Sequence, residues 1–144
     1  MKGIETLHLR GPAGALAAVL HLPELPPAPL VIACHGLLSS KDSPKYMELA
    51  DALAEAGLTC ARLDFAGCGE SAGALQETTV ARRVTELAVV AEALSAHRCV
   101  AGGLGLVGSS LGGFIALCHA KRDPNVRAVV TRSEERRVGK ECRL

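Results

Sequence analysis

The sequence predicts an α/β protein with a mostly parallel sheet, an antiparallel hairpin at its N-terminal end and helices on both faces. From residue 30 to residue 130, short apolar runs alternate with amphipathic segments of helical length, a pattern typical of parallel sheets built from β-α-β units. Two segments joined by a short turn come before this region, and they predict the hairpin.

The hairpin is expected from residues 4–10 and 15–22. Polar and apolar side chains alternate in the first segment, as in a strand with one buried face. The turn between the segments reads Gly11-Pro12-Ala13-Gly14, and glycine and proline favour a reversal of the chain. Residues 23–29 contain four prolines and are expected to form a loop, since they are too few to link separate domains.

Two strands with a helix between them follow the loop. Residues 30–34 form a continuous apolar run, which predicts a strand buried on both faces, and residues 58–63 are the next expected strand. The helix begins with Ser43 as N-cap and Pro44 at its first position, and it ends at Gly57. Its apolar stripe consists of Tyr46, Leu49, Ala50, Leu53 and Ala54.

The second half of the chain continues the alternation. Thr78 or Thr79 is expected to cap a long helix over residues 80–97. A strand over residues 104–107, a helix over residues 111–122 and a strand over residues 126–130 follow. Asp123-Pro124 separates the last two, because proline cannot continue a helix.

Composition limits the classes of function. The 144 residues are enough for one domain, and 49% of them are hydrophobic, which provides a sizeable core. A net charge of +1 gives no electrostatic basis for binding nucleic acid or an anionic membrane surface. No apolar run reaches the roughly 18 residues of a membrane span, and the first residues lack the pattern of a signal peptide.

The six cysteines are at positions 34, 60, 68, 99, 118 and 142, without a C-x-x-C pair or a metal-ligand spacing with histidine. Cys34 and Cys60 fall in expected buried strands, where a free thiol packs like a small apolar side chain. Reduced thiols predict a cytoplasmic protein, and no metal or cofactor is expected.

The clearest motif is centred on Ser110. Residues 108–112 read Gly-Ser-Ser-Leu-Gly and fit the pattern G-x-S-x-G. The strand expected before it and the helix expected after it provide the strand–turn–helix context in which such a serine is exposed as a nucleophile. Gly108 and Gly112 allow the strand and the helix to approach each other, and the N-terminus of the helix offers N–H groups to a developing negative charge.

Two other interpretations of this region stay open. Residues 103–108 also fit G-x-G-x-x-G, the dinucleotide-binding fingerprint, although that fingerprint follows a strand and opens a helix. Here the expected strand lies inside the motif. The other alternative is a turn rich in glycine and serine that has no chemistry.

Three loops containing glycine and serine are expected at the carboxyl ends of the parallel strands, over residues 35–42, 64–71 and 108–112. Active sites of open α/β sheets lie at this edge. The coincidence of the three loops favours a functional site over a plain turn.

The loops carry His35-Gly36, then Asp64-x-x-Gly67-x-Gly69-x-Ser71, then Gly108-x-Ser110-x-Gly112. In this combination and order they resemble the α/β-hydrolase superfamily. Over residues 1–130 the chain is most similar to its single-domain bacterial esterases and serine aminopeptidase-like enzymes, including feruloyl esterases. The resemblance implies the N-terminal part of an α/β-hydrolase fold.

The resemblance also implies roles for individual residues. Ser110 would be the nucleophile that forms an acyl-enzyme, and the backbone N–H groups of Leu37 and Leu111 would form the oxyanion hole. His35 and Gly36 would belong to the oxyanion loop, with His35 as a structural histidine. Asp64 would fix its own loop, and the glycines with structural roles would be Gly67, Gly69, Gly108 and Gly112.

The partners of the nucleophile are missing from the pattern. The superfamily places an acid and then a histidine after the serine. His119 is the only histidine after Ser110; nine residues along the same helix, it is expected on a helix face and not as the base. His97 is expected to be a surface residue, and Asp123 comes before any plausible strand that could carry the acid.

The last part of the chain differs in character. Eight of residues 132–144 are charged, and residues 132–142 resemble the translation of a sequencing adapter. We therefore expect a truncated α/β-hydrolase domain over residues 1–130 and a charged, non-native tail over residues 131–144. A genuine charged tail is the alternative.

The expected function is that of a serine hydrolase acting on a small-molecule carboxylic ester or a related acyl substrate, inactive as written because the acid and the histidine are missing. The first alternative is a non-catalytic hydrolase-like protein that binds a ligand or partner. The more remote alternative is a dinucleotide-binding domain.

Overall fold

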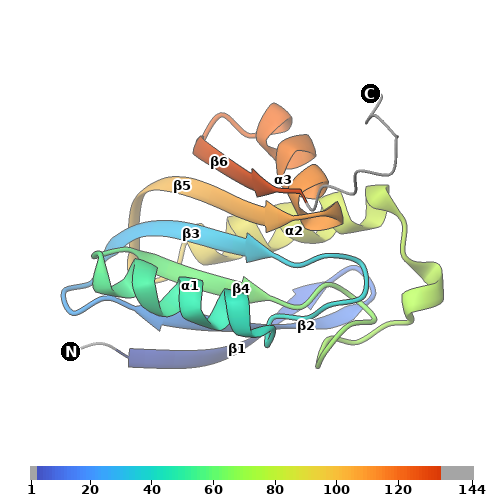
Figure 1. The fold of residues 1–144 in the computed structure, drawn as a ribbon, viewed down its shortest axis with the longest axis horizontal. Coiled ribbons are helices and arrows are strands. Elements are labelled where there is room, and N and C mark those ends of the chain that lie inside the picture. Colours follow the sequence, from blue (N-terminus) through green and yellow to red (C-terminus); the bar gives the residue numbers. More distant parts are fainter. Residues whose placement is uncertain (1–2, 134–144) are drawn as a thin grey trace.

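A single mixed sheet organises the chain. The computed structural model describes residues 3–133, which form six strands, three α-helices and one short 3-10 turn (Figure 1). The strands are β1 (Gly3–Gly11), β2 (Gly14–Leu22), β3 (Ala28–Cys34), β4 (Thr59–Leu63), β5 (Val100–Ser109) and β6 (Val126–Arg132). The helices are α1 (Pro44–Glu55), α2 (Val80–Ser95) and α3 (Leu111–Arg122), and the 3-10 turn is η1 (Leu75–Glu77).

The strand order in the sheet is β1-β2-β4-β3-β5-β6. β1 pairs antiparallel with β2, which pairs antiparallel with β4. From β4 through β3 and β5 to β6 all neighbours are parallel. The predicted fold class, a mostly parallel sheet with an antiparallel N-terminal hairpin, is therefore confirmed.

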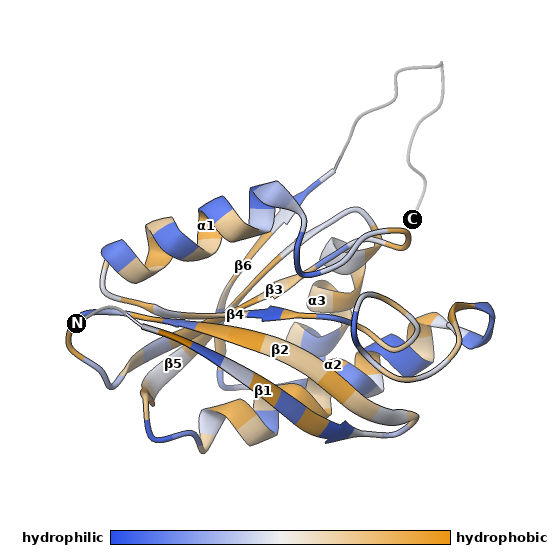
Figure 2. Cartoon of the chain, turned by 90° about the horizontal axis from the view of Figure 1, so that it is seen from below, coloured by the Kyte–Doolittle hydropathy of each residue, from blue (hydrophilic) through white to orange (hydrophobic). Residues whose placement is uncertain are grey.

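Helices cover both faces of the sheet. Figure 2 shows α1 on one face and α2 on the other, and α3 packs against α2, β5 and β6. The main core lies between the sheet and α2 and α3, where large aliphatic side chains from both layers leave water together. Its most deeply buried members include Leu16, Leu20, Leu30, Ile32, Leu63, Leu87, Leu94, Leu106 and Ile115.

Most strands are longer than expected because pairing with a neighbour extends them. β3 begins at Ala28, so the loop expected over residues 23–29 ends at residue 27. β5 begins at Val100, which pairs with Ala28 at the start of β3. β6 continues to Arg132, which pairs with Ser109 at the end of β5. β6 therefore runs across the boundary that the sequence predicts after residue 130; residues 134–144 of the predicted tail lie outside the described part of the chain.

The helix ends follow the local signals, with one exception at the start of α1. Thr79 caps α2, since its hydroxyl oxygen accepts the N–H of Arg82 at 3.0 Å, and Gly57 follows α1 with φ +94°, a conformation that ends a helix. Ser43 precedes α1, but its side chain makes no capping bond. The short turn η1, just before α2, was not expected.

The register of the sheet places the three predicted loops together. Cys34 at the end of β3 pairs with Leu63 at the end of β4 and with Gly108 near the end of β5. The segments that follow these strands therefore start at the same level, at the carboxyl edge of the sheet.

Candidate active site

Ser110 occupies a sharp turn between β5 and α3. Its backbone has φ 55° and ψ −125°, and it is the only residue other than glycine with a positive φ in residues 3–133. The turn is held on both sides, because the N–H of Ser110 donates to the carbonyl of Arg132 at 2.9 Å and its own carbonyl accepts the N–H groups of Gly113 and Phe114. The residue is exposed, so a strained backbone presents its hydroxyl to solvent.

The glycines on either side of this turn have no room for a side chain. A Cβ on Gly108 would lie 2.5 Å from the carbonyl of Gly112. A Cβ on Gly112 would overlap the carbonyl oxygen of Cys34 and lie 2.5 Å from that of His35. The turn is thus pressed against the end of β3, and only glycine permits this approach.

A tyrosine from α1 fixes the residue before the serine. The hydroxyl of Tyr46 donates to the carbonyl of Cys34 at 3.0 Å and is 2.7 Å from Oγ of Ser109. Because its single proton goes to Cys34, Ser109 is the donor in the second bond. The side chain of Ser109 is therefore buried and hydrogen-bonded to Tyr46, whereas Ser110 is exposed. The sequence placed Tyr46 on an apolar stripe and contained no signal for this contact.

The loop after β3 passes beside the turn. A Cβ on Gly36 would lie 3.6 Å from Cβ of Ser110. The ring of His35 is buried; its Nδ1 donates to the carbonyl of Gly36 at 2.6 Å, and its Nε2 accepts the N–H of Phe65 at 3.0 Å. Burial lowers the pKa of His35, so the ring is neutral and joins two loops.

Two backbone N–H groups, one in the loop after β3 and one at the start of α3, lack a hydrogen-bond partner within residues 3–133. They belong to Leu37 and Leu111, and the first N–H groups of a helix have no partner inside it. A cavity of about 330 Å³ beside the turn is lined by Lys45, Ser109, Ser110 and Arg132. Leu111 follows Ser110 directly, and Leu37 follows Gly36, which lies beside Ser110.

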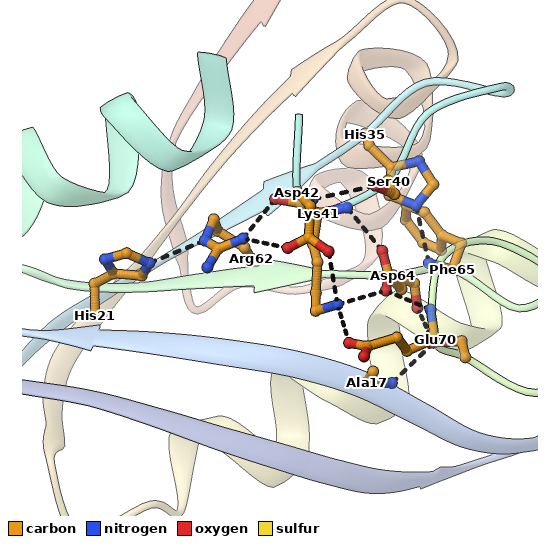
Figure 3. Close-up of polar contacts among 11 residues, drawn as sticks. Ala17, His21, His35, Ser40, Lys41, Asp42, Arg62, Asp64, Phe65 and Glu70 are labelled. Carbon is orange, nitrogen blue, oxygen red and sulfur yellow. Dashed lines mark hydrogen bonds and ion pairs between the residues drawn. The ribbon is translucent and has the colours of Figure 1, made fainter. Parts of the chain in front are cut away.

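The loop after β4 is built around Asp64 (Figure 3). The carboxylate is fully buried and accepts three bonds, from Lys41 N at 2.7 Å, Lys41 Nζ at 2.9 Å and Glu70 N at 2.9 Å. Gly69, with φ +54°, lies so close to Asp64 that no side chain fits there. Asp64 therefore connects the loop after β3 with the loop after β4. Gly67, in the same loop, also has a positive φ and no space for a Cβ.

A chain of polar contacts continues from Lys41 to Arg62 and His21 (Figure 3). Nη1 of Arg62 donates to the carbonyl of Lys41 at 2.7 Å, and Nε donates to Nε2 of His21 at 2.9 Å. The Nδ1–H of His21 in turn donates to Asp51 at 2.9 Å. Burial and the nearby Arg62 lower the pKa of His21. The sequence carries no signal for this network, because its members are far apart in the chain.

No histidine or carboxylate bonds to the hydroxyl of Ser110 in the part of the chain that the structure describes. His119 lies on α3 and its Nε2 is 2.9 Å from Asp123. His97 was expected at the surface, but its side chain is only 13% exposed and pairs with Glu5 at 2.8 Å, because the end of α2 packs beside β1.

The dinucleotide interpretation does not fit the fold. All residues of the G-x-G-x-x-G match, 103–108, lie inside β5, whereas the fingerprint must open a helix. Residues 3–133 contain no cluster of three potential metal ligands. Their helices are all too short or too polar to span a membrane.

Comparisons with known proteins agree with this geometry. Residues 26–133 match the family described as serine aminopeptidase, S33. A protein of Escherichia coli, the uncharacterized 31.7 kDa protein of the traX–finO intergenic region, is 30% identical over 106 residues, which are 72% of this chain and 36% of that protein.

Solved structures of other hydrolases superimpose on most of this chain. XC6422 from Xanthomonas campestris, an α/β serine hydrolase without a lid, superimposes with a TM-score of 0.77 at 30% identity, over 89% of this chain and 60% of that one. Est1E from Butyrivibrio proteoclasticus with bound ferulic acid superimposes with a TM-score of 0.80 at 23% identity, over 85% of this chain and 50% of that one. Dienelactone hydrolase from Anabaena variabilis superimposes with a TM-score of 0.79 at 22% identity, over 91% of this chain and 63% of that one.

This chain thus spans about a third of the curated relative and half to two thirds of these solved structures. By the match of residues 26–133 and by its fold, the chain belongs to the serine aminopeptidase, S33 family of the α/β-hydrolase superfamily.

Proposed function

We propose that this hydrolase transfers acyl groups from small-molecule carboxylic esters through Ser110. The observation that carries the proposal is the backbone of Ser110, with φ 55° and ψ −125° at the N-terminus of α3. Such strain is retained where the surrounding structure over-determines it, and it is concentrated at functional sites. The exposed hydroxyl, next to a buried and bonded Ser109, supports the choice of the second serine.

In this mechanism Oγ of Ser110 attacks the ester carbonyl and forms an acyl-enzyme, and the alcohol leaves. The carbonyl oxygen becomes negative in the tetrahedral intermediate. The N–H groups of Leu111 and Leu37 donate to it, with the positive end of the α3 dipole behind Leu111. The loss of one such donor typically lowers the rate by about 10²–10³.

Two structural neighbours bear on the substrate class. XC6422 is a serine hydrolase without a lid, and Est1E holds ferulic acid, an aromatic carboxylic acid. The leaving group of an ester is an alcohol, which requires less assistance from a general acid than an amine does. We therefore place carboxylic esters before peptides as the substrate class.

The proposal assigns the triad acid and histidine to sequence outside residues 3–133. The relatives are longer than this chain, and Ser110 has no base within the described residues. A serine without a base is a weak nucleophile at neutral pH. We therefore expect little or no turnover of short-chain esters by the 144-residue chain, and ordinary esterase rates that Ser110→Ala abolishes would contradict this.

A stoichiometric test separates the site from turnover. The chain is incubated with an alkyl fluorophosphonate, with imidazole added as an external base, and modification is located by mass spectrometry in the tryptic peptide 99–121. We expect phosphonylation at Ser110, accelerated by imidazole, lost in Ser110→Ala and retained in Ser109→Ala. Modification at Ser109, or none at either serine in the folded chain, would overturn the proposal and favour a non-catalytic binding protein.

A further inference from the structure

Arg83 is a buried cation behind the loop that carries Leu37. It lies on α2, its side chain is 1% exposed, and its guanidinium is 4.8 Å from the centre of the Phe65 ring. Nη1 lies 3.4 Å from the carbonyl oxygen of Gly36, and Nη2 lies 3.4 Å from that of Leu37. Nη2 also lies 3.4 Å from Sγ of Cys68.

No carboxylate forms a direct ion pair with this cation within residues 3–133. The carboxylate of Glu86, also buried on α2, interacts with the charge of Arg83 but accepts its hydrogen bond from Ala66 N. Within the same residues, Nε of Arg83 is buried without a hydrogen-bond partner. A buried charge that no carboxylate pairs directly is costly, and an apolar side chain of similar volume would serve the core as well or better. The position of Arg83 is therefore explained by what it holds and not by core stability.

The carbonyl of Gly36 sets the direction of a donor in the proposed oxyanion hole. It belongs to the same planar peptide group as the N–H of Leu37, and in a trans peptide the two point in opposite directions. The Gly36 oxygen accepts hydrogen bonds from Nδ1 of His35 at 2.6 Å and from Nη1 of Arg83 at 3.4 Å. Fixing this oxygen fixes the Leu37 N–H, which has no protein partner in the described residues.

The charge of Arg83 also strengthens this donor. A cation at the oxygen end of a peptide group polarises it, and hydrogen-bonded chains reinforce each other in a low dielectric. The contact with the Leu37 carbonyl holds the next peptide group as well, so two consecutive groups of the loop are attached to one rigid fork.

We propose that Arg83 is a positioning residue of the oxyanion hole, which orients and polarises the Leu37 N–H through the Gly36 carbonyl. The proposal rests on the acyl-transfer function proposed for Ser110. It assigns to α2 a role that its sequence pattern does not indicate.

The first measurement is amide hydrogen exchange by mass spectrometry, which needs no turnover. Arg83→Met removes the charge at similar volume, Arg83→Lys keeps the charge without the fork, and Arg82→Met is the matched control on the exposed face of α2. In Arg83→Met we expect exchange of residues 65–68 to rise about tenfold, because the loosened loop no longer holds His35, whose Nε2 accepts the N–H of Phe65. Residues 59–63 of β4 should be unchanged. In Arg82→Met both segments should match the parent.

The second measurement is the rate of Ser110 phosphonylation with imidazole present. We expect it to fall at least tenfold in Arg83→Met, to recover in part in Arg83→Lys, and to stay at the parent value in Arg82→Met. If Arg83→Met unfolds, the Arg83→Lys comparison alone decides, with an intermediate loss expected.

The outcomes separate the two proposals. Unchanged exchange at residues 65–68, equal increases along the whole chain, or an unchanged rate of phosphonylation in folded Arg83 variants would overturn the role of Arg83. If the parent chain takes up no phosphonate while Arg83→Met still raises the exchange of residues 65–68, the acyl-transfer function fails, and Arg83 holds the loop for structure alone.

Discussion

Gly112→Ala should destabilise the turn at Ser110 by an amount that follows from its neighbours. The new Cβ would overlap the carbonyl oxygen of Cys34 and lie 2.5 Å from that of His35. Both obstacles are backbone atoms, so no side-chain rotation can relieve the contact, and the cost lies near the upper end of the roughly 1–3 kcal/mol that overpacking causes. Alanine recovers about 1 kcal/mol over glycine in a helix. The expected net loss is about 2 kcal/mol.

The assay is urea or thermal unfolding, in which a loss of this size lowers the melting temperature of a chain of this length by roughly 7 °C. Gly105→Ala is the matched control, because a Cβ there meets Val31 at an ordinary 3.6 Å. It should leave stability nearly unchanged. Equal stability of Gly112→Ala and Gly105→Ala would refute the argument that close backbone approach requires Gly112.

Three further outcomes follow from the polar contacts. Tyr46→Phe should cost about 1–3 kcal/mol of unfolding free energy, because it leaves the buried hydroxyl of Ser109 unpaired. In the Tyr46→Phe background, Ser109→Ala should be nearly neutral. Strict additivity of the two losses in a double-mutant cycle would contradict the pairing. Lys41→Met should cost about 3–5 kcal/mol in denaturant unfolding, since it leaves Asp64 as an uncompensated buried charge, and a loss below about 1 kcal/mol would contradict this. The pKa of His21 in the folded state lies below its usual 6.5, so the unfolded state takes up this proton first as the pH falls. The contribution of His21 to stability is therefore full above pH 6.5 and declines as the pH falls through the folded pKa. His21→Gln should flatten that decline in unfolding curves measured from pH 7 to pH 5, and an identical slope in the variant would disprove the assignment.

The elements of the fold could be predicted because their signals are local. The apolar run of β3, Thr79 before α2 and Gly57 after α1 act on neighbouring residues, and the structure has each where the sequence indicates. The ends of β5 and β6 could not be predicted, because pairing with a strand distant in the sequence extends them. The candidate site follows the same division: the G-x-S-x-G pattern identifies the turn, while Tyr46 beneath it comes from α1, 63 residues away from Ser109.

Arg82 and Arg83 show why the rest required the fold. They are adjacent and chemically identical, yet one is exposed and the other is fully buried against Phe65 and the loop of Gly36. A helix turns by 100° per residue, so which of the two faces inward depends on how α2 is rotated against the sheet. His97 is a similar case, covered because the end of α2 meets Glu5 of β1.

The sequence by itself determined the order of strands and helices, the strained turn at Ser110 and the glycines around it, because these depend on backbone preferences of a few consecutive residues. The tertiary structure alone decided the place of β4 between β2 and β3, the burial of Lys41, Arg62 and Arg83, and the contacts that hold the loop of Leu37. Those features depend on free energies of burial and hydrogen bonding between segments far apart in the chain, which exist only after the sheet has formed.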